Sequence, residues 1–338
     1  MEGVVAVGKI DAESRKYLSV NQIFADAFNY LIYDGDQVIL PEKLRTVDTT
    51  EIAIPYGNNS RVPVQKYRDT MKIWAAMEDE YAVYVLLGGE AQSHVHYAMP
   101  VKDMLYDALN YAAQVDEARR SYRKKAGVDK TGINNAVDRG ELVFEENQLK
   151  IRLTAEEFLS GFRKGDKLIP VITAVIYFGP EKWDGPTSIR EMVKVPDKRM
   201  LRAIPDYFIN LIAPAEIDDG DFDKFHTDLG FAMKVIKHQK DDAVEIIKAT
   251  DHRKIDRNTA EFLNTVANLN LVYDEAEEEV AVDMCKAMED YTKKTEIIGA
   301  IKVLRSMGTQ ENEIVAAIIK QFEVTAEYVK ALMQPQAV

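Results

Sequence analysis

The chain has 338 residues, which is enough for one large domain or two ordinary ones. Hydrophobic residues make up 46% and charged residues 29%, and no apolar run is long enough to cross a bilayer, so we expect no membrane-spanning segment. The formal net charge of −13 excludes a protein that coats nucleic acid through bulk electrostatics, so any DNA-binding surface has to be a local basic strip.

The front part of the sequence predicts a helix followed by two strands. Residues 1–19 read as a lead-in without regular structure, and the apolar spacing of Asn21–Tyr33 predicts a helix. After a long irregular stretch, strands are expected at Lys66–Met77 and Ala82–Gln92, joined by a short acidic turn.

A second helix is expected to open at Pro100 and to run to about Lys125. Its predicted buried stripe consists of Val101, Leu105, Ala108, Leu109, Ala112 and Val115. A small hairpin at Glu141–Leu153 and a buried strand at Leu168–Phe178 follow, and Ser188-x-x-Glu191 predicts a capping box at the start of a further helix.

From Met200 onward the pattern predicts an almost wholly helical region, whose last two helices are expected at Gln310–Gln321 and Ala326–Met333. We interpret it as a packing or self-association region, through which the protein could form a homo-oligomer. Its Cys285 is the chain's single cysteine, which excludes an intrachain disulfide and fits a reducing cytoplasm. The expected organisation is a lead-in at 1–19, an α/β domain at 20–198 and a helical region at 199–338.

The two strands carry the residues with the clearest chemistry. If their turn is centred between Asp79 and Glu80, residue 71 faces 88, 73 faces 86 and 69 faces 90. That register places Asp69 beside Glu90, and Gln92 on the same face as Glu90. Two neighbouring carboxylates repel unless a proton or a cation joins them, and hard oxygen ligands suit Mg²⁺ or Mn²⁺.

A structural interpretation of Asp69 stays open at this point. A strand-end aspartate next to Arg68 can form a solvated ion pair with it, and a one-residue shift of the turn would break the predicted pairing.

Longer segments make the chain resemble the PD-(D/E)XK nuclease superfamily and, within it, the recombination-promoting nuclease (Rpn) and putative transposase family of bacteria. The matching segments lie in the expected order between about residues 20 and 195. They are F-A-D-A-F-N (24–29), L-R-T-V-D-T-T-E (44–51), R-D-T-M-K (68–72), L-L-G-G-E-A-Q (86–92), H-Y-A-M-P-V-K-D-M-L-Y-D-A-L-N-Y (96–111) and P-V-I-T-A-V-I-Y-F-G with W-D-G-P (170–186).

The resemblance implies a restriction-endonuclease-like core, with a mixed central sheet flanked by helices, that hydrolyses DNA phosphodiester bonds with Mg²⁺ or Mn²⁺. By this likeness Asp69 and Glu90 are metal ligands together with the backbone carbonyl of Ala91. Gln92 stands where the wider superfamily has lysine, and it carries no charge. Lys102 stands where relatives commonly place arginine, so a bidentate phosphate contact would become a point charge.

A basic cluster late in the second helix supplies a candidate DNA contact. It consists of Arg119, Arg120, Arg123, Lys124 and Lys125. These residues could bind the DNA backbone beside the site, or they could form a solvated helix end that the helix dipole favours.

Other polar residues receive a structural interpretation. Asp26 could be an outer-shell acid, but an exposed helix position is expected. Asp48 and Glu51, in a loop, could contribute acid to the site or cap a turn, and a structural role is favoured. His94 and His96 are expected to support the site from outside or to face solvent, because two histidines alone seldom make a zinc site. Two further function classes stay open besides a nuclease. One is a nuclease-fold binding or regulatory module whose chemistry has decayed, and the other is a helical interaction protein.

Overall fold

The computed structural model describes residues 2–46, 50–53, 64–67, 69–75, 84–125, 142–146, 149–240, 243–249, 253–269, 271–272 and 281–333. The chain divides into two compact units, which are described separately. One comprises Ser14–Thr227, and the other comprises Met1–Glu13 together with Asp228–Val338. This division lies at residue 227, whereas the residue pattern predicts a boundary at 198.

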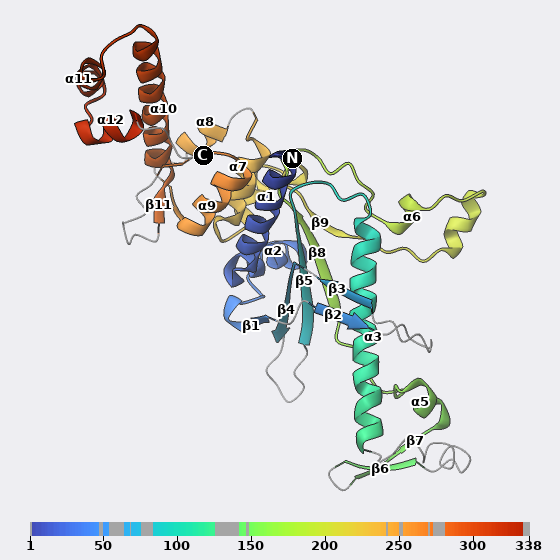
Figure 1. The fold of residues 1–338 in the computed structure, drawn as a ribbon. Helices are drawn as coiled ribbons and strands as arrows, with labels where there is room; N and C mark the ends of the chain where they lie inside the picture. Colours follow the sequence, from blue (N-terminus) through green and yellow to red (C-terminus); the bar gives the residue numbers. More distant parts are fainter. Residues whose placement is uncertain are drawn as a thin grey trace. The chain divides into compact units, whose positions relative to one another are not determined.

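A five-stranded mixed sheet forms the centre of the first unit (Figure 1). Its strand order is β1 (Leu44–Thr46), β4 (Thr70–Ala75), β5 (Tyr84–Gln92), β8 (Val171–Tyr177) and β9 (Asn210–Ile212). β4 pairs antiparallel with both β1 and β5, whereas β5, β8 and β9 are parallel. The predicted α/β class with a mixed sheet flanked by helices is therefore confirmed.

Helices cover both faces of this sheet (Figure 1). On one side lie α2 (Asn21–Tyr33) and the end of α1 (Glu2–Ser19), and on the other lies α3 (Met99–Lys125). The approach of α1 and α2 is close, because a Cβ atom at Gly89 would lie 2.9 Å from Leu18 Cδ2 and 3.1 Å from Phe24 Cε2. Glycine at this position of β5 therefore lets the helices pack directly on the strand.

α2 has the predicted bounds and buries the predicted residues Ile23, Phe24, Ala27 and Phe28. The expectation for Asp26 was wrong, because its side chain is buried. Its carboxylate accepts hydrogen bonds from the backbone N–H groups of His226 and Thr227, each at 2.9 Å, and from Thr227 Oγ1 at 2.5 Å. The aspartate thus ties the first part of the unit to its last residues.

The predicted buried stripe of α3 was wrong in part. Val101 and Ala108 are exposed, whereas Leu105, Leu109, Ala112 and Val115 are half-buried. The buried residues of α3 include polar Asp103 and Asp107 beside Met99 and Tyr106. Asp107 accepts a hydrogen bond from Thr173 Oγ1 on β8 at 2.7 Å, and Tyr111 Oη accepts one from the backbone N–H of Val171 at 3.1 Å. A polar helix face here satisfies buried polar groups of β8, which an apolar stripe would leave unpaired.

The register of the β4–β5 pair was predicted correctly. Met71 pairs with Gly88 and Ile73 with Leu86. The first strand is divided, however, because β3 (Val64–Tyr67) pairs with β2 (Thr50–Ala53) in a separate two-stranded sheet before β4 begins. The prediction of one continuous strand at Lys66–Met77 did not anticipate this change of partner.

Shorter elements complete the first unit. The predicted small hairpin is present, but Ser188 does not form the predicted capping box: Glu191 accepts hydrogen bonds from the backbone N–H and the hydroxyl of Thr187 instead. β9 shows that the sheet extends past residue 200, where helix was expected. The remaining elements are η1 (Pro41–Lys43), β6 (Leu142–Glu146), β7 (Leu149–Leu153), α5 (Ala155–Ser160), α6 (Ile189–Met192), η2 (Lys198–Ala203), η3 (Pro214–Glu216) and η4 (Asp221–Lys224).

The second unit is mainly helical. The lead-in expected at residues 1–19 is in fact helix α1, whose first part belongs to this unit. The other elements are α7 (Asp228–Lys237), α8 (Ala243–Lys248), β10 (Lys254–Asp256), α9 (Arg257–Val266), β11 (Ala281–Asp283), α10 (Met284–Ser306), α11 (Glu311–Phe322) and α12 (Ala326–Met333). α10, α11 and α12 enclose an apolar cluster of Ile297, Ile301, Ile314, Ile318 and Val329. Among the described residues, no helix has both the length and the apolar character that a membrane span requires.

A buried lysine supports the contact between β4 and the α1–α2 junction. Lys72 is almost fully buried, and its ammonium donates hydrogen bonds to the Ser19 carbonyl at 2.6 Å and to Asn21 Oδ1. Burial lowers the pKa of Lys72 to about 8 from its usual 10.5.

This lowered pKa predicts a pH dependence of stability. Between pH 8 and 10.5 the unfolded chain holds a proton on Lys72 that the folded chain has released, so stability rises with pH across this window. We expect the free energy of unfolding of the wild type to rise relative to that of Lys72→Met by roughly 3 kcal/mol from pH 7 to pH 10.5. Urea titrations of both proteins measure this difference, and parallel pH profiles would contradict the assignment.

Candidate active site

Asp69 lies immediately before β4, at the point where pairing with β5 ends. Its Oδ2 accepts a hydrogen bond from the backbone N–H of Ala91 at 3.1 Å, in the place where a backbone carbonyl of β4 would continue the ladder. Its Oδ1 accepts a hydrogen bond from Arg15 Nη1 at 3.5 Å. Nothing in the sequence pattern identified Arg15, because its helix was not expected.

Glu90 is the most deeply buried acid of the candidate site. Its side chain has 0% exposure, and its Oε2 accepts a hydrogen bond from Lys102 Nζ at 2.7 Å. Lys102 extends from the first turns of α3, which lies over the face of β5 that carries Glu90 and Gln92. The lysine that was expected to contact phosphate therefore forms an ion pair with a candidate metal ligand.

The ammonium of Lys102 acts on both acids. Burial alone lowers the pKa of Lys102, but the attraction of Glu90, the hydrogen bond to it and the field of Asp69 outweigh this effect, so the pKa is raised. For Asp69, burial raises the pKa more than Lys102, Arg15 and the Ala91 N–H lower it. The positive charge of Lys102 thus acts on two acids from neighbouring strands. Both acids are largely buried, and burial disfavours a charged carboxylate unless a cation lies nearby.

The backbone of Ala91 faces the same edge as Asp69. The N–H and C=O of a strand residue point to the same side, so the Ala91 carbonyl lies on the edge where its N–H meets Asp69. On the next residue, Gln92, the carbonyl accepts from the Phe178 N–H at 2.7 Å, and the half-buried side chain shares the face of Glu90.

These donors fit a hard divalent cation. Mg²⁺ is commonly bound in proteins through one or two carboxylates and completes its shell with water and substrate oxygens, and the chain offers Asp69, Glu90 and the Ala91 carbonyl. In the described part of the chain, no three or more histidine, cysteine, aspartate or glutamate side chains are grouped to hold a metal.

The basic cluster of α3 lies far along the helix from Lys102. Arg119 is 17 residues later, which corresponds to roughly 25 Å of helix. It donates a hydrogen bond to the Ser160 carbonyl on α5 at 3.3 Å and forms an ion pair with Asp116 at 3.7 Å. Arg120 is exposed, and the side chains of Arg123, Lys124 and Lys125 lie outside the described residues.

The other candidates do not join the site in the described structure. His94 and His96 are exposed, and His94 Nδ1 lies 2.9 Å from Ser93 Oγ. Asp48 and the side chain of Glu51 lie outside the described residues.

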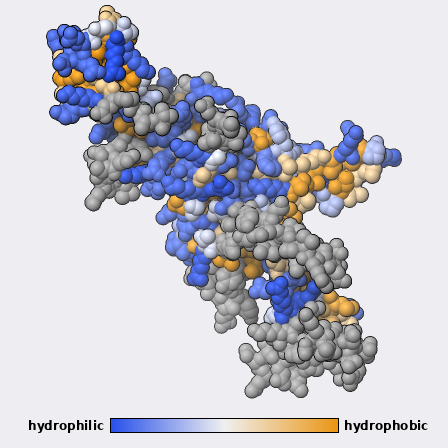
Figure 2. All heavy atoms as spheres, in the orientation of Figure 1, coloured by the Kyte–Doolittle hydropathy of each residue, from blue (hydrophilic) through white to orange (hydrophobic). Residues whose placement is uncertain are grey.

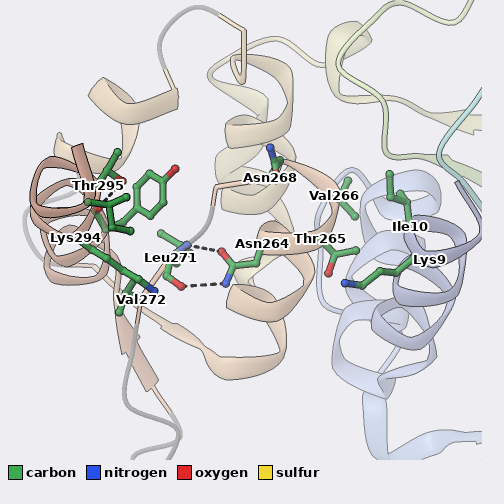
Figure 3. Close-up of a pocket in the computed structure, with 12 residues that line it drawn as sticks. Lys9, Ile10, Asn264, Thr265, Val266, Asn268, Leu271, Val272, Lys294 and Thr295 are labelled. Atoms are coloured by element: carbon green, nitrogen blue, oxygen red, sulfur yellow. Dashed lines mark hydrogen bonds between the residues drawn. The ribbon is translucent and has the colours of Figure 1, made fainter. Parts of the chain in front are cut away.

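A separate pocket of about 840 Å³ lies in the second unit (Figure 3). Lysines from two helices, Lys9 and Lys294, line it, and the Asn264 side chain holds the backbone of Leu271 at its wall. None of the described residues that line this pocket is an aspartate, glutamate, histidine or cysteine.

The first unit is thus an α/β fold in which Asp69, paired with Arg15, and Glu90, paired with Lys102, lie near the end of an antiparallel strand pair. Comparisons with protein-family models, with curated proteins and with solved structures found no match for this chain.

The Glu90–Lys102 pair predicts a coupled effect on stability. Removing one member of a buried ion pair leaves the other as a buried charge without a partner. We therefore expect Lys102→Met to lower the free energy of unfolding by about 3 kcal/mol. Adding Glu90→Gln to that variant should recover at least about 1 kcal/mol, since it removes the unpaired buried charge of Glu90. Urea unfolding of the double-mutant cycle tests this, with exposed Lys182→Met as the control. Strictly additive effects would contradict the coupling.

Proposed function

We propose that this protein is a metal-dependent endonuclease that hydrolyses DNA phosphodiester bonds, of the PD-(D/E)XK class and the recombination-promoting nuclease and transposase type. One observation carries the proposal: Asp69 and Glu90, from neighbouring strands, both lie in the field of the Lys102 ammonium, which pairs with Glu90, while Arg15 pairs with Asp69. An arrangement of this kind suits a divalent ion and a phosphate more readily than a purely structural ion pair, which needs only one acid.

The order of elements supports the proposed class. The strand that follows Asp69 pairs antiparallel with the strand that bears Glu90 and Gln92, and α3 and the parallel strand β8 come next. The order of a helix, a strand next to the aspartate, a strand with Glu-x-Gln, a helix and a buried strand is that of a PD-(D/E)XK nuclease core. The single cysteine fits the cytoplasm as the compartment in which such a protein would meet DNA.

Each residue has a distinct part in the proposed reaction. Asp69, Glu90 and the Ala91 carbonyl would hold Mg²⁺ or Mn²⁺, which would supply an acidified water and neutralise charge on the phosphate. Lys102 supplies the positive charge that Gln92 lacks. Once a divalent ion neutralises Glu90, its ammonium can turn to a phosphate oxygen, since its side chain is a quarter exposed. Gln92 can donate a hydrogen bond to a phosphate oxygen or a water, but it cannot act as a base.

Cleavage of supercoiled plasmid tests the proposal. We expect the wild type to nick it with Mg²⁺ or Mn²⁺, and Asp69→Asn and Glu90→Gln to reduce the rate at least about 100-fold. Asp36→Asn, an exposed acid outside the site, serves as the matched control and should cleave like the wild type. A wild type that leaves plasmid intact with either metal, or site variants that cleave at the wild-type rate, would refute the catalytic proposal.

A second candidate function is a nuclease-fold module that binds DNA or a regulatory partner without cutting. The uncharged Gln92 and the net charge of −13 favour it.

Metal-induced thermal stabilisation distinguishes the two. If the site holds a cation, Mn²⁺ at 100 times its Kd should stabilise the wild type by about 2.7 kcal/mol, seen as a rise in Tm, and Asp69→Asn should abolish this rise. A Tm that Mn²⁺ leaves unchanged would favour the binding module, in which the ammonium of Lys102 is the permanent partner of Glu90.

A further inference from the structure

An excursion of the chain connects β8 to β9 in the first unit. Its stem is antiparallel: Ile189 N–H donates to the Tyr207 carbonyl at 3.1 Å, and Ile209 N–H donates to the Thr187 carbonyl at 3.0 Å. Residues 189–208, here called the basic excursion, carry α6 and η2 and extend outward from this stem (Figure 1).

The basic excursion reverses the charge of the chain locally. It contains five cations and three acids, a net of +2, in a protein whose net charge is −13. Two of the cations are engaged, since Arg190 donates to the Ile204 carbonyl and Arg199 pairs with Asp197. The other three, Lys194, Lys198 and Arg202, are exposed and form no ion pair within the described residues.

Large apolar side chains lie exposed among these cations. Met192 is 37% exposed, Met200 49% and Phe208 64%. Figure 2 shows this projecting part of the molecule with hydrophobic surface beside hydrophilic surface. Apolar groups of this size cost free energy in water, so their concentration on one projection indicates a contact surface.

The base of the basic excursion is fixed to the elements that carry the candidate site. Tyr207 Oη donates a hydrogen bond to Asp107 Oδ2 on α3 at 2.6 Å, and α3 also carries Lys102. Ile209, next to Phe208, packs in a buried cluster with Met99 and Val175, and Val175 pairs with Glu90 across the sheet. A ligand held by the excursion would therefore be held in a fixed relation to the acids.

We propose that the basic excursion binds duplex DNA, with Lys194, Lys198 and Arg202 on phosphates and with Phe208 and Met200 against sugars or base edges. This inference rests on the proposed function, which it extends by naming the DNA-contacting element. Phosphate binding is driven by lysine and arginine, and apolar wedges beside them are a common device for gripping DNA. An anionic membrane is the less suitable partner, because α6 and η2 span only 4 and 6 residues and form no long amphipathic helix.

Fluorescence anisotropy with a labelled 20-base-pair duplex in EDTA tests binding without cleavage. We expect the combined substitution Lys194→Gln, Lys198→Gln and Arg202→Gln to weaken binding at least tenfold in 0.1 M salt, and to lower the slope of log K against log salt by about 2 to 3. The matched control replaces three exposed lysines of the second unit by glutamine, Lys286, Lys293 and Lys302, and should bind like the wild type. Phe208→Ala should weaken binding and leave the salt slope unchanged.

The outcomes separate this inference from the proposed function. Wild-type binding that the combined substitution leaves unchanged overturns the inference, even if the plasmid is cleaved. Binding that depends on the basic excursion, in a protein that cleaves nothing, supports the inference and refutes the nuclease. Phosphatidylserine vesicles form the third arm: a wild type that binds them through the same three residues, and does not bind duplex, overturns the inference in favour of a membrane.

Discussion

The burial of Glu90 is the constraint on which the candidate site depends. A carboxylate with 0% exposure has lost its water, and it is tolerable only beside a cation or with a proton. Lys102 meets this need from α3, so the helix and the strand are held together by charge at this point. The same pair also limits access to the site, because a divalent ion that binds Glu90 must compete with an ammonium at 2.7 Å. The two proposed functions differ in its outcome: a divalent ion displaces the Lys102 ammonium from Glu90 in the nuclease, whereas the ammonium stays in place in the binding module.

The position of Asp69 follows from where a strand pair ends. The pairing of β4 with β5 ends at the pair Thr70–Gly89, so among the described residues no β4 residue pairs with Ala91, and its N–H and carbonyl lie just beyond the end of this ladder. Asp69 satisfies the N–H, and the carbonyl remains on that edge as a further oxygen. The change of partner from β2 to β5 therefore creates the site, since an uninterrupted hairpin would have used these backbone groups in its own ladder.

The sequence predicted what local periodicity controls. The bounds of α2 and the pairing of Met71 with Gly88 followed from the spacing of apolar residues and the position of a turn, which are properties of neighbouring residues. Contacts between distant segments could not be predicted in this way. Asp26 looked like a surface position because its partners are 200 residues away, and the polar face of α3 is explained only by β8 and Tyr207. The ion pair of Lys102 with Glu90 could not be predicted either, because its prediction requires knowing which face of the sheet α3 covers.

The proposed action on DNA poses an electrostatic problem, because a protein with a net charge of −13 has an overall field that repels DNA. Salt screens the electrostatic interaction between charges over about 10 Å at ordinary ionic strength. A small cationic projection can therefore attract DNA locally although the body of the protein repels it. Such a projection can place DNA at the candidate site only if its position relative to Asp69 and Glu90 is fixed. The hydrogen bond of Tyr207 to Asp107 and the packing of Ile209 provide that relation, since both lead to elements that hold Lys102 and Glu90. If the basic excursion binds DNA as proposed, the hydrogen bond between Tyr207 and Asp107 on α3 serves recognition as well as folding.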